Sequence, residues 1–390
     1  MDLLINPSKL KGTISVIPSK SQAHRLLICA AFADRSTTLF CADTNRDIEA
    51  TVDCLNALGA NITRTDIGYK VFPIVRLQKT AVLNCCESGS TLRFMLPIAG
   101  ALGVNATFQM AGRLPQRPLS PLWEEMERMG CTLSRPTANT ICCEGKLKYG
   151  AYYMDGRVSS QFLSGLEFAF WIMGGDGLTL IINGAIQSRP YYAMTKKIIA
   201  RFSNEKRRLS SEVVVEGDWS NGAFWLTATF FGSELTVLNL DECTTQGDLA
   251  IIDILPQIKS GTPTINAADI PDLVPILSVA AAAKQGAVFT DIARLRLKES
   301  DRVASIIAML ESLGGKAEAT ENTLTVYPAT LTGGVVHSFG DHRIAMSAAI
   351  AATICTHPVT ILGAECVTKS YPKFWDDYHF LGGQYEKQLR

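Results

Sequence analysis

The sequence predicts an α/β protein built from repeated units and divided into two domains. Polar turns that open directly into Ala- and Leu-rich helices recur along the chain, amphipathic helices follow them, and short β-branched runs lie between the helices. At 390 residues the chain is also longer than one hydrophobic core usually supports. These observations together favour two domains of alternating helices and strands.

The polar turns form the first half of the recurring unit. Each turn has small or charged residues that suit a helix N-cap, and an apolar stretch long enough for a buried helix follows. Such a recurrence indicates the architecture before any detail is known. The openings are PSKSQAHRLLICAAFA at Pro18, ESGSTLRFMLPIAGAL at Glu87, VSSQFLSGLEFAFWIM at Val158, GDWSNGAFWLTATFFG at Gly217, IPDLVPILSVAAAA at Ile270 and GDHRIAMSAAIAAT at Gly340.

The second half of the unit is an amphipathic helix, with apolar residues three and four positions apart. It often ends in Leu-Gly or Met-Gly, as expected for a helix that a glycine terminates. The six segments are DIEATVDCLNALGANIT, PLWEEMERMGCTL, YYAMTKKIIARFSN, GDLAIIDILPQI, DRVASIIAMLESLGGKAEA and FWDDYHFLGGQYE. Three such units, roughly 50 to 70 residues apart, would make one domain.

Two segments are expected to connect the domains. The first follows the Gly-Thr pair near position 12, and the second is the polar, basic stretch from Asn204 to Ser211. One domain would then comprise residues 1–18 and 217–390, and the other residues 19–216.

The composition argues against several classes of function. The chain has 37 basic and 37 acidic residues, so no overall charge attracts nucleic acid or an anionic membrane. Neither a P-loop nor a dinucleotide-binding glycine motif is present, and the five histidines lack metal-ligand spacing. Without a leader or a long apolar stretch, we expect a soluble, cytoplasmic protein with eleven reduced cysteines.

The helix openings have the features of an anion-binding site. Each presents unpaired backbone N–H groups and the positive end of a helix dipole. Several also carry a cation, among them Lys20, Arg25, Arg93 and Arg343. If these helix ends converge on a cleft, the resulting pocket would suit phosphates and carboxylates.

Taken singly, these residues have a simpler interpretation. An isolated Arg or Lys at a helix start is usually a solvated charge, and Ser159 and Ser160 suit helix capping. Asp272 stands at the head of the helix LVPILSVAAAA, where an Asp is more often an N-cap than a catalyst. The recurrence of charged groups at several openings is what favours a functional site.

Nine segments, taken in their order along the chain, resemble one known family. They are PSKSQAHR, SGSTLR, RPL, SSQFLSGL, SRPY, IPD, RLKESDR, DHRIAM and TKSYPKF. From Pro18 to about Trp375 the chain is similar to the enolpyruvyl transferases, and to their shikimate 3-phosphate branch. The resemblance implies two domains, each of three repeated β-α-β-α-β-β units in an inside-out α/β barrel, with the active site in the cleft between them.

The resemblance also implies an activity. The enzyme would move the enolpyruvyl (carboxyvinyl) group of phosphoenolpyruvate to the 5-hydroxyl of shikimate 3-phosphate, through a tetrahedral intermediate, and release phosphate. This reaction leads to chorismate and the aromatic amino acids. The resemblance implies no metal and no organic cofactor. The balanced charge argues against a nucleic-acid or membrane partner, and we expect a monomer.

Carried over to this chain, the resemblance assigns residues to each substrate. Phosphoenolpyruvate would be bound by Lys20, Gly89, Arg117, Gln161, Arg302, Arg343 and Lys369. Shikimate 3-phosphate would be bound by Lys20, Ser21, Arg25, Ser159, Ser160, Gln161, Ser188, Tyr191, Asp272 and Lys298.

The resemblance further implies the catalytic residues. The acceptor hydroxyl must lose a proton while C3 of phosphoenolpyruvate gains one, so a base and an acid are both required. Asp272 is expected to accept the hydroxyl proton, and Glu299 and Lys20 are the candidates for proton transfer at C3. We assign no substrate contact to Glu87 and Arg294, because the family usually has Asn at both positions.

Two other functions fit parts of the pattern. The sister enzyme that transfers enolpyruvyl to UDP-N-acetylglucosamine shares the fold, but it usually has a cysteine shortly before the Arg-Pro at Arg117, and GRLPQRP has none. A non-enzymatic scaffold of repeats would bind a partner along its surface. Such a scaffold would have no reason to gather charged residues at helix openings.

Overall fold

The computed structural model describes residues 1–204 and 212–388. Helices and strands interleave along the chain, which confirms the α/β prediction. The chain divides into two compact units, which we describe separately: unit 1 comprises Met1–Ile17 and Gly217–Arg390, and unit 2 comprises Pro18–Glu216. Of the predicted connecting stretch from Asn204 to Ser211, all but Asn204 lies outside the described residues.

The predicted helix openings are the starts of six helices. Five of them are capped by Ser19, Ser88, Ser159, Asp218 and Asp341, whose side chains accept a backbone N–H of the first turn. Each cap satisfies a donor that a helix start otherwise leaves unpaired. The helices are α1 (Lys20–Ala31), α3 (Gly89–Leu102), α5 (Ser160–Met173), α7 (Trp219–Phe230), α9 (Val274–Ala282) and α11 (His342–Ala352).

The predicted amphipathic segments are also helical. Gly59, for example, ends the first of them in the left-handed region, with φ at 115°, the conformation that makes Leu-Gly a helix-stop signal. The helices are α2 (Arg46–Leu58), α4 (Leu122–Arg128), α6 (Arg189–Asn204), α8 (Ile251–Ser260), α10 (Arg302–Ser312) and α12 (Phe374–Phe380). Short 3-10 helices precede four of these: η1 (Leu114–Gln116), η3 (Gly247–Ala250), η4 (Ala293–Leu297) and η5 (Ala364–Lys369).

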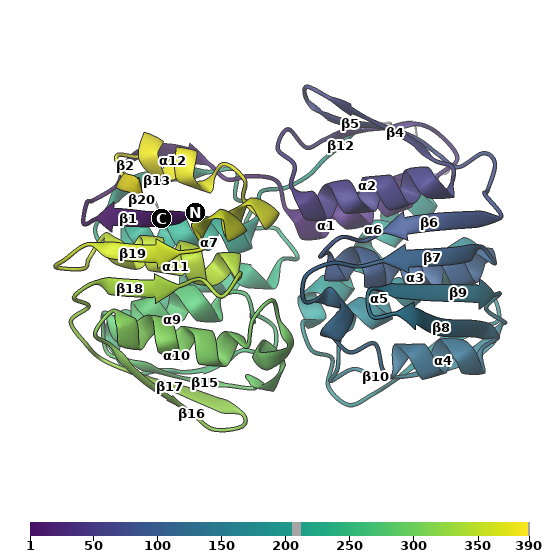
Figure 1. The fold of residues 1–390 in the computed structure, drawn as a ribbon. Helices are drawn as coiled ribbons and strands as arrows, with labels where there is room; N and C mark the ends of the chain where they lie inside the picture. The colour runs from purple at the N-terminus through teal and green to yellow at the C-terminus, as the bar shows by residue number, and fades with distance from the viewer. Residues whose placement is uncertain (205–211, 389–390) are drawn as a thin grey trace. The chain divides into compact units, whose positions relative to one another are not determined.

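Three sheets surround the helices of unit 2. Each sheet contains one pair of parallel strands, and in two sheets a hairpin extends the pair in antiparallel fashion. Figure 1 shows the second sheet edge to edge as β6, β7, β9 and β8. The strands, in sheet order, are β12 (Glu212–Val214), β3 (Thr37–Phe40), β5 (Gly68–Phe72) and β4 (Asn61–Thr65); β6 (Thr80–Asn84), β7 (Asn105–Gln109), β9 (Thr140–Gly145) and β8 (Cys131–Thr137); and β10 (Gly150–Asp155) with β11 (Leu178–Asn183).

Unit 1 repeats this plan. Its N-terminal strand β1 pairs with strands from the C-terminal part of the chain, so both ends of the sequence belong to one unit. The strands, in sheet order, are β18 (Gly334–His337), β19 (Val359–Leu362), β1 (Asp2–Asn6) and β20 (Gln384–Gln388); β14 (Thr264–Asn266), β15 (Ala287–Thr290), β17 (Thr323–Tyr327) and β16 (Lys316–Ala319); and β13 (Glu234–Leu238) with β2 (Lys11–Ser15).

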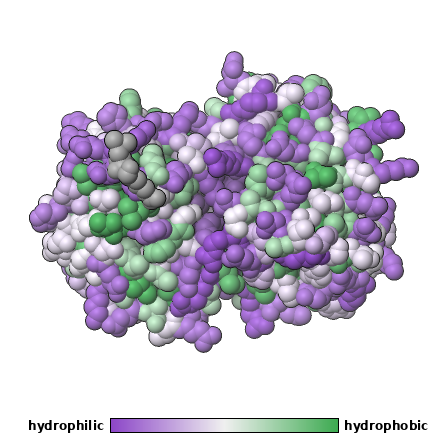
Figure 2. Space-filling model, viewed as in Figure 1, coloured by the Kyte–Doolittle hydropathy of each residue, from purple (hydrophilic) through white to green (hydrophobic). Residues whose placement is uncertain are grey.

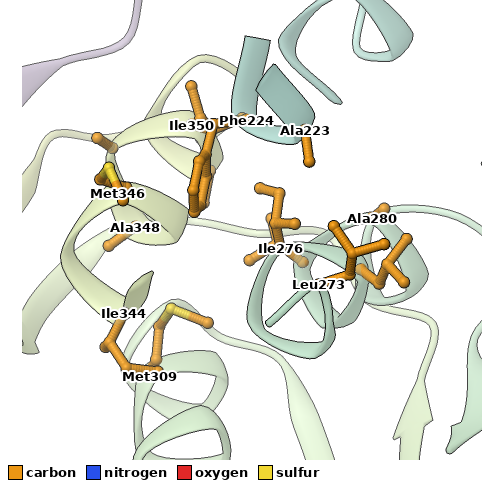
Figure 3. Packing of buried hydrophobic residues seen from close by; sticks show 14 of the residues in the cluster. Ala223, Phe224, Leu273, Ile276, Ala280, Met309, Ile344, Met346, Ala348 and Ile350 are labelled. Carbon is orange, nitrogen blue, oxygen red and sulfur yellow. The ribbon is translucent and has the colours of Figure 1, made fainter. Parts of the chain in front are cut away.

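Buried helices form the centre of each unit. In unit 1 every residue of α9 and α11 is buried, and α7, α9 and α11 pack against one another. Figure 3 shows Phe224 beside Ile350, and Met309 beside Ile344, in this core. The surrounding strands alternate between more and less buried residues, so each sheet has one inner face. The surface in Figure 2 is largely hydrophilic with scattered apolar areas, and none of the described helices is long and apolar enough to span a membrane.

One detail differs from the expected repeat. In each unit, one sheet has only two strands, because the described residues contain no hairpin after α8 or α6. In unit 1 only residues 261–263 separate α8 from β14, which already pairs with β15 in another sheet. Three residues cannot supply two further strands. The unit β-α-β-α-β-β is therefore complete in two of the three repeats of unit 1.

Gly165 allows α5 to pass close to α3. A Cβ at this position would lie 2.3 Å from the backbone oxygen of Arg93, which cannot rotate away as a side chain would. We expect Gly165→Ala to lower the free energy of unfolding by about 1–3 kcal/mol, the usual cost of overpacking. Gly261→Ala is the matched control, since no described atom lies within 4 Å of its Cβ position. Urea denaturation should separate the two variants, and equal stabilities would contradict the packing argument.

Candidate functional site

Asp272 lies among three cations in unit 1. Its Oδ1 accepts hydrogen bonds from Arg302 Nη1 at 2.7 Å and from Lys298 Nζ at 3.5 Å. Its Oδ2 accepts a hydrogen bond from Arg343 Nη2 at 3.2 Å. The first turns of α10 and α11, and the segments that precede α9 and α10, thus meet at one carboxylate. We call this group the Asp272 cluster, and it comprises Asp272, Lys298, Glu299, Arg302, Asp341 and Arg343.

The interpretation of Asp272 as a helix N-cap is wrong. The N-cap residue of α9 is Leu273, and among the described residues no side chain caps this helix. Pro275 occupies the first turn, where its missing N–H leaves one donor fewer to satisfy. The helix can therefore begin without a polar cap, and the Asp272 carboxylate pairs with cations instead.

Arg302 is the buried centre of the cluster, with a side chain only 1% exposed. Its Nε donates to Asp341 Oδ2 at 3.0 Å, and its Nη2 donates to Glu299 Oε2 at 2.9 Å. Asp341 also caps α11, because its Oδ1 accepts the backbone N–H of Arg343 at 2.9 Å. Three carboxylates thus face three cations, so that the charges removed from water are paired.

These charges also set the protonation states. Burial by itself would raise the pKa of Asp272, but Arg343, Lys298 and Arg302 attract its charged form more strongly and hold the pKa well below 3.8. Burial lowers the pKa of Lys298 to about 8, although the nearby Asp272 opposes this shift. Asp272 is therefore a firmly ionised carboxylate, whereas Lys298 is an amine that titrates near neutral pH.

Lys369, the remaining residue assigned to unit 1, lies on an adjoining element. Lys369 is the last residue of η5, which packs against α11. His342, the first residue of α11, is buried. Five predicted residues, Asp272, Lys298, Glu299, Arg302 and Arg343, are thus in one network of contacts, and Lys369 belongs to a neighbouring segment.

A second group of predicted residues comes together in unit 2, around Gly89. A Cβ on Gly89 would lie 2.7 Å from Arg117 Nη1 and 2.9 Å from Arg93 Nη1, so both guanidinium groups lie directly against this glycine. Arg93 Nη1 donates to Gln161 Oε1 at 2.9 Å, and Gln161 Nε2 donates to Ser90 Oγ at 2.8 Å. Two cations therefore lie at the N-terminus of α3, where an anion would also meet free N–H groups.

Lys20, the first residue of α1, donates to Asp47 Oδ2 at 3.1 Å. The side chains of both residues are largely buried, with 18% and 10% exposed. Asp47 is the second residue of α2, so this ion pair ties together the starts of two helices. Asp47 was not predicted from the sequence as a site residue, although the first turn of a helix is a common place for acidic residues.

Arg25 is held by protein groups on every side. Its Nε donates to Thr195 Oγ1 at 2.7 Å, its Nη1 to the backbone oxygen of Ser21 at 2.7 Å, and its Nη2 to that of Tyr191 at 3.0 Å. These bonds join α1 to α6. Arg25 is only 2% exposed, and in this structure it holds Ser21 and Tyr191 in place.

The other residues assigned to the acceptor lie at two helix starts. Ser159 caps α5 by accepting the N–H of Gln161, and Ser160 is the first residue of that helix. Ser188 directly precedes α6, and its backbone oxygen accepts the N–H of Tyr191 at 3.1 Å. Capping explains Ser159 alone, because no equivalent capping bond explains Ser160 within the described part of the chain.

A buried chain of hydroxyl groups links the helix starts of unit 2. Thr91 Oγ1 donates to Ser88 Oγ, Thr51 Oγ1 pairs with Thr91 Oγ1, and His24 Nδ1 pairs with Thr51 Oγ1, each at 2.7 Å. Since each hydroxyl has a single proton, Thr51 donates to Thr91, and His24 donates through its Nδ1–H. Helices α1, α2 and α3 are thus connected by polar contacts that no sequence motif predicts.

His24 is neutral in this chain of bonds. Burial lowers its pKa to about 3, and its Nε2 has no hydrogen-bond partner among the residues that the structure describes. A protonated ring would bury an unpaired N–H and a charge. The folded state therefore binds the His24 proton more weakly than the unfolded chain, whose histidine has a pKa near 6.5.

This difference predicts a loss of stability in acid. Above pH 6.5 neither state holds the proton, whereas below pH 6.5 the unfolded chain gains a proton that the folded chain rejects until about pH 3. Between pH 7 and pH 5 this difference lowers the free energy of unfolding by about 2 kcal/mol. We expect His24→Asn to reduce the fall in unfolding free energy over this range, as measured by urea denaturation at both pH values. His357→Asn, at an exposed position, is the control. An unchanged acid dependence in His24→Asn would show that the folded chain binds the His24 proton as readily as the unfolded chain does.

Comparison with known proteins shows the family to which the chain belongs. A family model described as EPSP synthase (3-phosphoshikimate 1-carboxyvinyltransferase) matches residues 4–262 and 259–378. A protein of Clostridium kluyveri named 3-phosphoshikimate 1-carboxyvinyltransferase is 34% identical over 417 residues, covering 98% of both chains. A protein of the same name from Clostridium acetobutylicum is 36% identical over 416 residues, with 97% of both chains covered.

Solved structures show the same fold at lower sequence identity. An EPSP synthase from Acinetobacter baumannii has a TM-score of 0.78 at 20% identity, with 99% of this chain and 100% of that chain covered. The enolpyruvyl transferase NikO from Streptomyces tendae has a TM-score of 0.75 at 14% identity, with 100% and 99% covered.

Proposed function

We propose the following function on the premise that the chain belongs to the EPSP synthase family, 3-phosphoshikimate 1-carboxyvinyltransferase. It transfers the enolpyruvyl group of phosphoenolpyruvate to the 5-hydroxyl of shikimate 3-phosphate and releases phosphate. This is a step in the synthesis of chorismate and the aromatic amino acids. The relatives carry the name of this branch, so the UDP-N-acetylglucosamine reaction is not favoured.

The observation that supports this function best is the placement of cations at helix starts in both units. Arg93 and Arg117 lie against Gly89 at the start of α3, and Arg343 lies in the first turn of α11. A substrate with a phosphate and a carboxylate needs cations from several directions, which forked arginine side chains supply. Helix N–H groups at the same positions add to the attraction for anions.

We propose that both groups of residues bind the substrates of this reaction. Phosphoenolpyruvate would be bound by the cations around Gly89 together with Arg302, Arg343 and Lys369. The acceptor would be bound through Ser21, Tyr191 and the other residues assigned above. The different chemistry of the two units supports this proposal. Unit 1 contains the titratable groups of the Asp272 cluster, and unit 2 contains short hydroxyl side chains that suit a sugar-like ring. A cytoplasmic location and a monomeric state stay predictions.

Phosphate release tests the function directly. The purified protein should release phosphate from phosphoenolpyruvate when shikimate 3-phosphate is added, and it should release none with UDP-N-acetylglucosamine. Release with the UDP-sugar alone would assign the chain to the sister reaction, and no release with either acceptor would refute the proposed function.

Gly89→Ala should weaken phosphoenolpyruvate binding. The new methyl group would displace the guanidinium groups of Arg93 and Arg117, which lie 2.9 and 2.7 Å from the Cβ position. Losing one charge-assisted contact costs about 1.5–3 kcal/mol, so the KM for phosphoenolpyruvate should rise on the order of 10- to 100-fold. The thermal midpoint should barely change, because the displaced atoms are the ends of side chains.

Arg117→Ala and Lys369→Ala should weaken phosphoenolpyruvate binding on the same scale, since each removes a cation from a doubly anionic ligand. Lys11→Ala is the control, because the Lys11 side chain is 79% exposed and pairs with Glu234 at the surface. Binding can be measured by isothermal titration calorimetry in the presence of shikimate 3-phosphate. Wild-type affinity in Arg117→Ala or Lys369→Ala would remove that residue from the proposed site.

A further inference from the structure

We propose that Asp47 is a positioning residue for enolpyruvyl transfer, and that it holds the Lys20 ammonium in place for the incoming phosphoenolpyruvate. The inference rests on the proposed function and deepens it, because it names a residue that acts on the substrate through Lys20. The structural basis is the set of contacts around the start of α2 in unit 2.

Only the pairing with Lys20 explains why the Asp47 carboxylate is buried. Its side chain is 10% exposed, although a carboxylate in a helix first turn can interact with the helix dipole while it is exposed to water. Capping does not explain the burial either, because Asn45 caps α2 by accepting the N–H of Ile48 at 3.1 Å. A carboxylate that is removed from water needs a cation. The Lys20 ammonium, at 3.1 Å, is that cation.

Asp47 is itself held rigidly by its surroundings. Its backbone oxygen accepts a hydrogen bond from Thr91 Oγ1 at 3.4 Å. The same hydroxyl lies 2.7 Å from the Oγ of Ser88, which caps α3. The loop before α2 is fixed as well, because Arg64 Nη1 donates to the backbone oxygen of Cys41 at 2.9 Å. The carboxylate that Lys20 meets therefore belongs to a frame shared with the start of α3.

This frame connects Lys20 to the cations around Gly89. Ser88, at the end of the contacts that begin at Asp47, directly precedes Gly89, and the guanidinium of Arg117 lies against that glycine. Two of the groups assigned to phosphoenolpyruvate are thus tied to one another inside unit 2. Cations that are fixed before the anion arrives bind it at a lower entropic cost.

A lysine benefits particularly from such a partner. Its four-carbon side chain has many rotamers, and ordering them on binding costs entropy. The bond to Asp47 restricts these rotamers in advance, so less entropy is lost when the substrate binds. An ammonium has three N–H donors, and this bond uses one of them. The Lys20 ammonium can therefore bind a phosphate or carboxylate oxygen while its bond to Asp47 persists.

A double-mutant cycle tests whether Asp47 acts through Lys20. Asp47→Ala should lower kcat/KM for phosphoenolpyruvate, measured by phosphate release, by about tenfold or more. In a Lys20→Ala background the same substitution should change kcat/KM by less than about twofold, because the group that Asp47 positions is gone. The control is Asp53→Ala, which removes an exposed carboxylate from the same helix and should leave kcat/KM within about twofold of the wild type.

A binding measurement repeats the cycle without turnover. Isothermal titration calorimetry with phosphoenolpyruvate, in the presence of shikimate 3-phosphate, should show weaker binding for Asp47→Ala in the wild-type background and no further weakening in the Lys20→Ala background. If Asp47→Ala lowers the thermal midpoint, Asp47→Asn replaces it in both cycles, since it keeps the size of the side chain and removes the charge. We expect the same coupling with a smaller loss.

Three results would overturn the proposal. Equal losses in the two backgrounds would show that Asp47 supports the start of α2 and not Lys20. An unchanged kcat/KM in both Asp47→Ala and Asp47→Asn would show that Lys20 needs no partner. An increase would show that the carboxylate mainly repels the anionic substrate. None of these results would affect the proposed function, which depends on phosphate release by the wild type alone.

Discussion

The pairing of buried Arg302 with three carboxylates is the interaction on which unit 1 depends most. A guanidinium that is 1% exposed is tolerated only because Asp272, Glu299 and Asp341 surround it. The same contacts fix the starts of α10 and α11 relative to the segment before α9. Because the cluster is both the structural anchor and the proposed catalytic centre, removal of Arg302 would disturb folding and chemistry together.

In unit 2 the helix starts are also held together by polar contacts, but most of the groups involved are uncharged. Its helix starts are joined by a chain of neutral groups and by the ion pair of Lys20 with Asp47; the neutral groups are His24, Thr51, Thr91 and Ser88. Neutral hydrogen bonds fix the relative positions of these helix starts. Arg117 lies against Gly89 at a helix N-terminus, where an anion is attracted by both charge and backbone. The two units thus differ in chemistry although they share one repeated fold.

The repeat itself explains this combination of rigidity and function. Each buried helix is long, apolar and packed on all sides, so its first turn is held by the core rather than by the surface. Polar residues at that turn are then positioned by the whole unit. The short two-stranded sheets lie beside α7 and α5, whereas the Asp272 cluster belongs to the two complete repeats of unit 1.

The sequence by itself determined the elements and their kind. The six polar openings and the amphipathic segments were enough to predict every long helix, because capping and helical periodicity act between residues close in the chain. The nine matching segments also predicted the family, and hence the activity. Residues such as Lys298, Glu299 and Arg302 could be named together because one short stretch contains them.

Only the tertiary structure decided what these residues do to one another. Asp272 looked like a helix cap. Its place among cations from the segment before α10, from α10 and from α11 depends on residues 26 to 71 positions away in the sequence. The roles of Asp341, Asp47 and the hydrogen-bonded groups around His24 could likewise not be predicted from the sequence. Hydrogen bonds and pKa shifts depend on distances across the core. Local sequence patterns determine where a helix begins, whereas electrostatic interactions depend on which helix starts are brought together by folding.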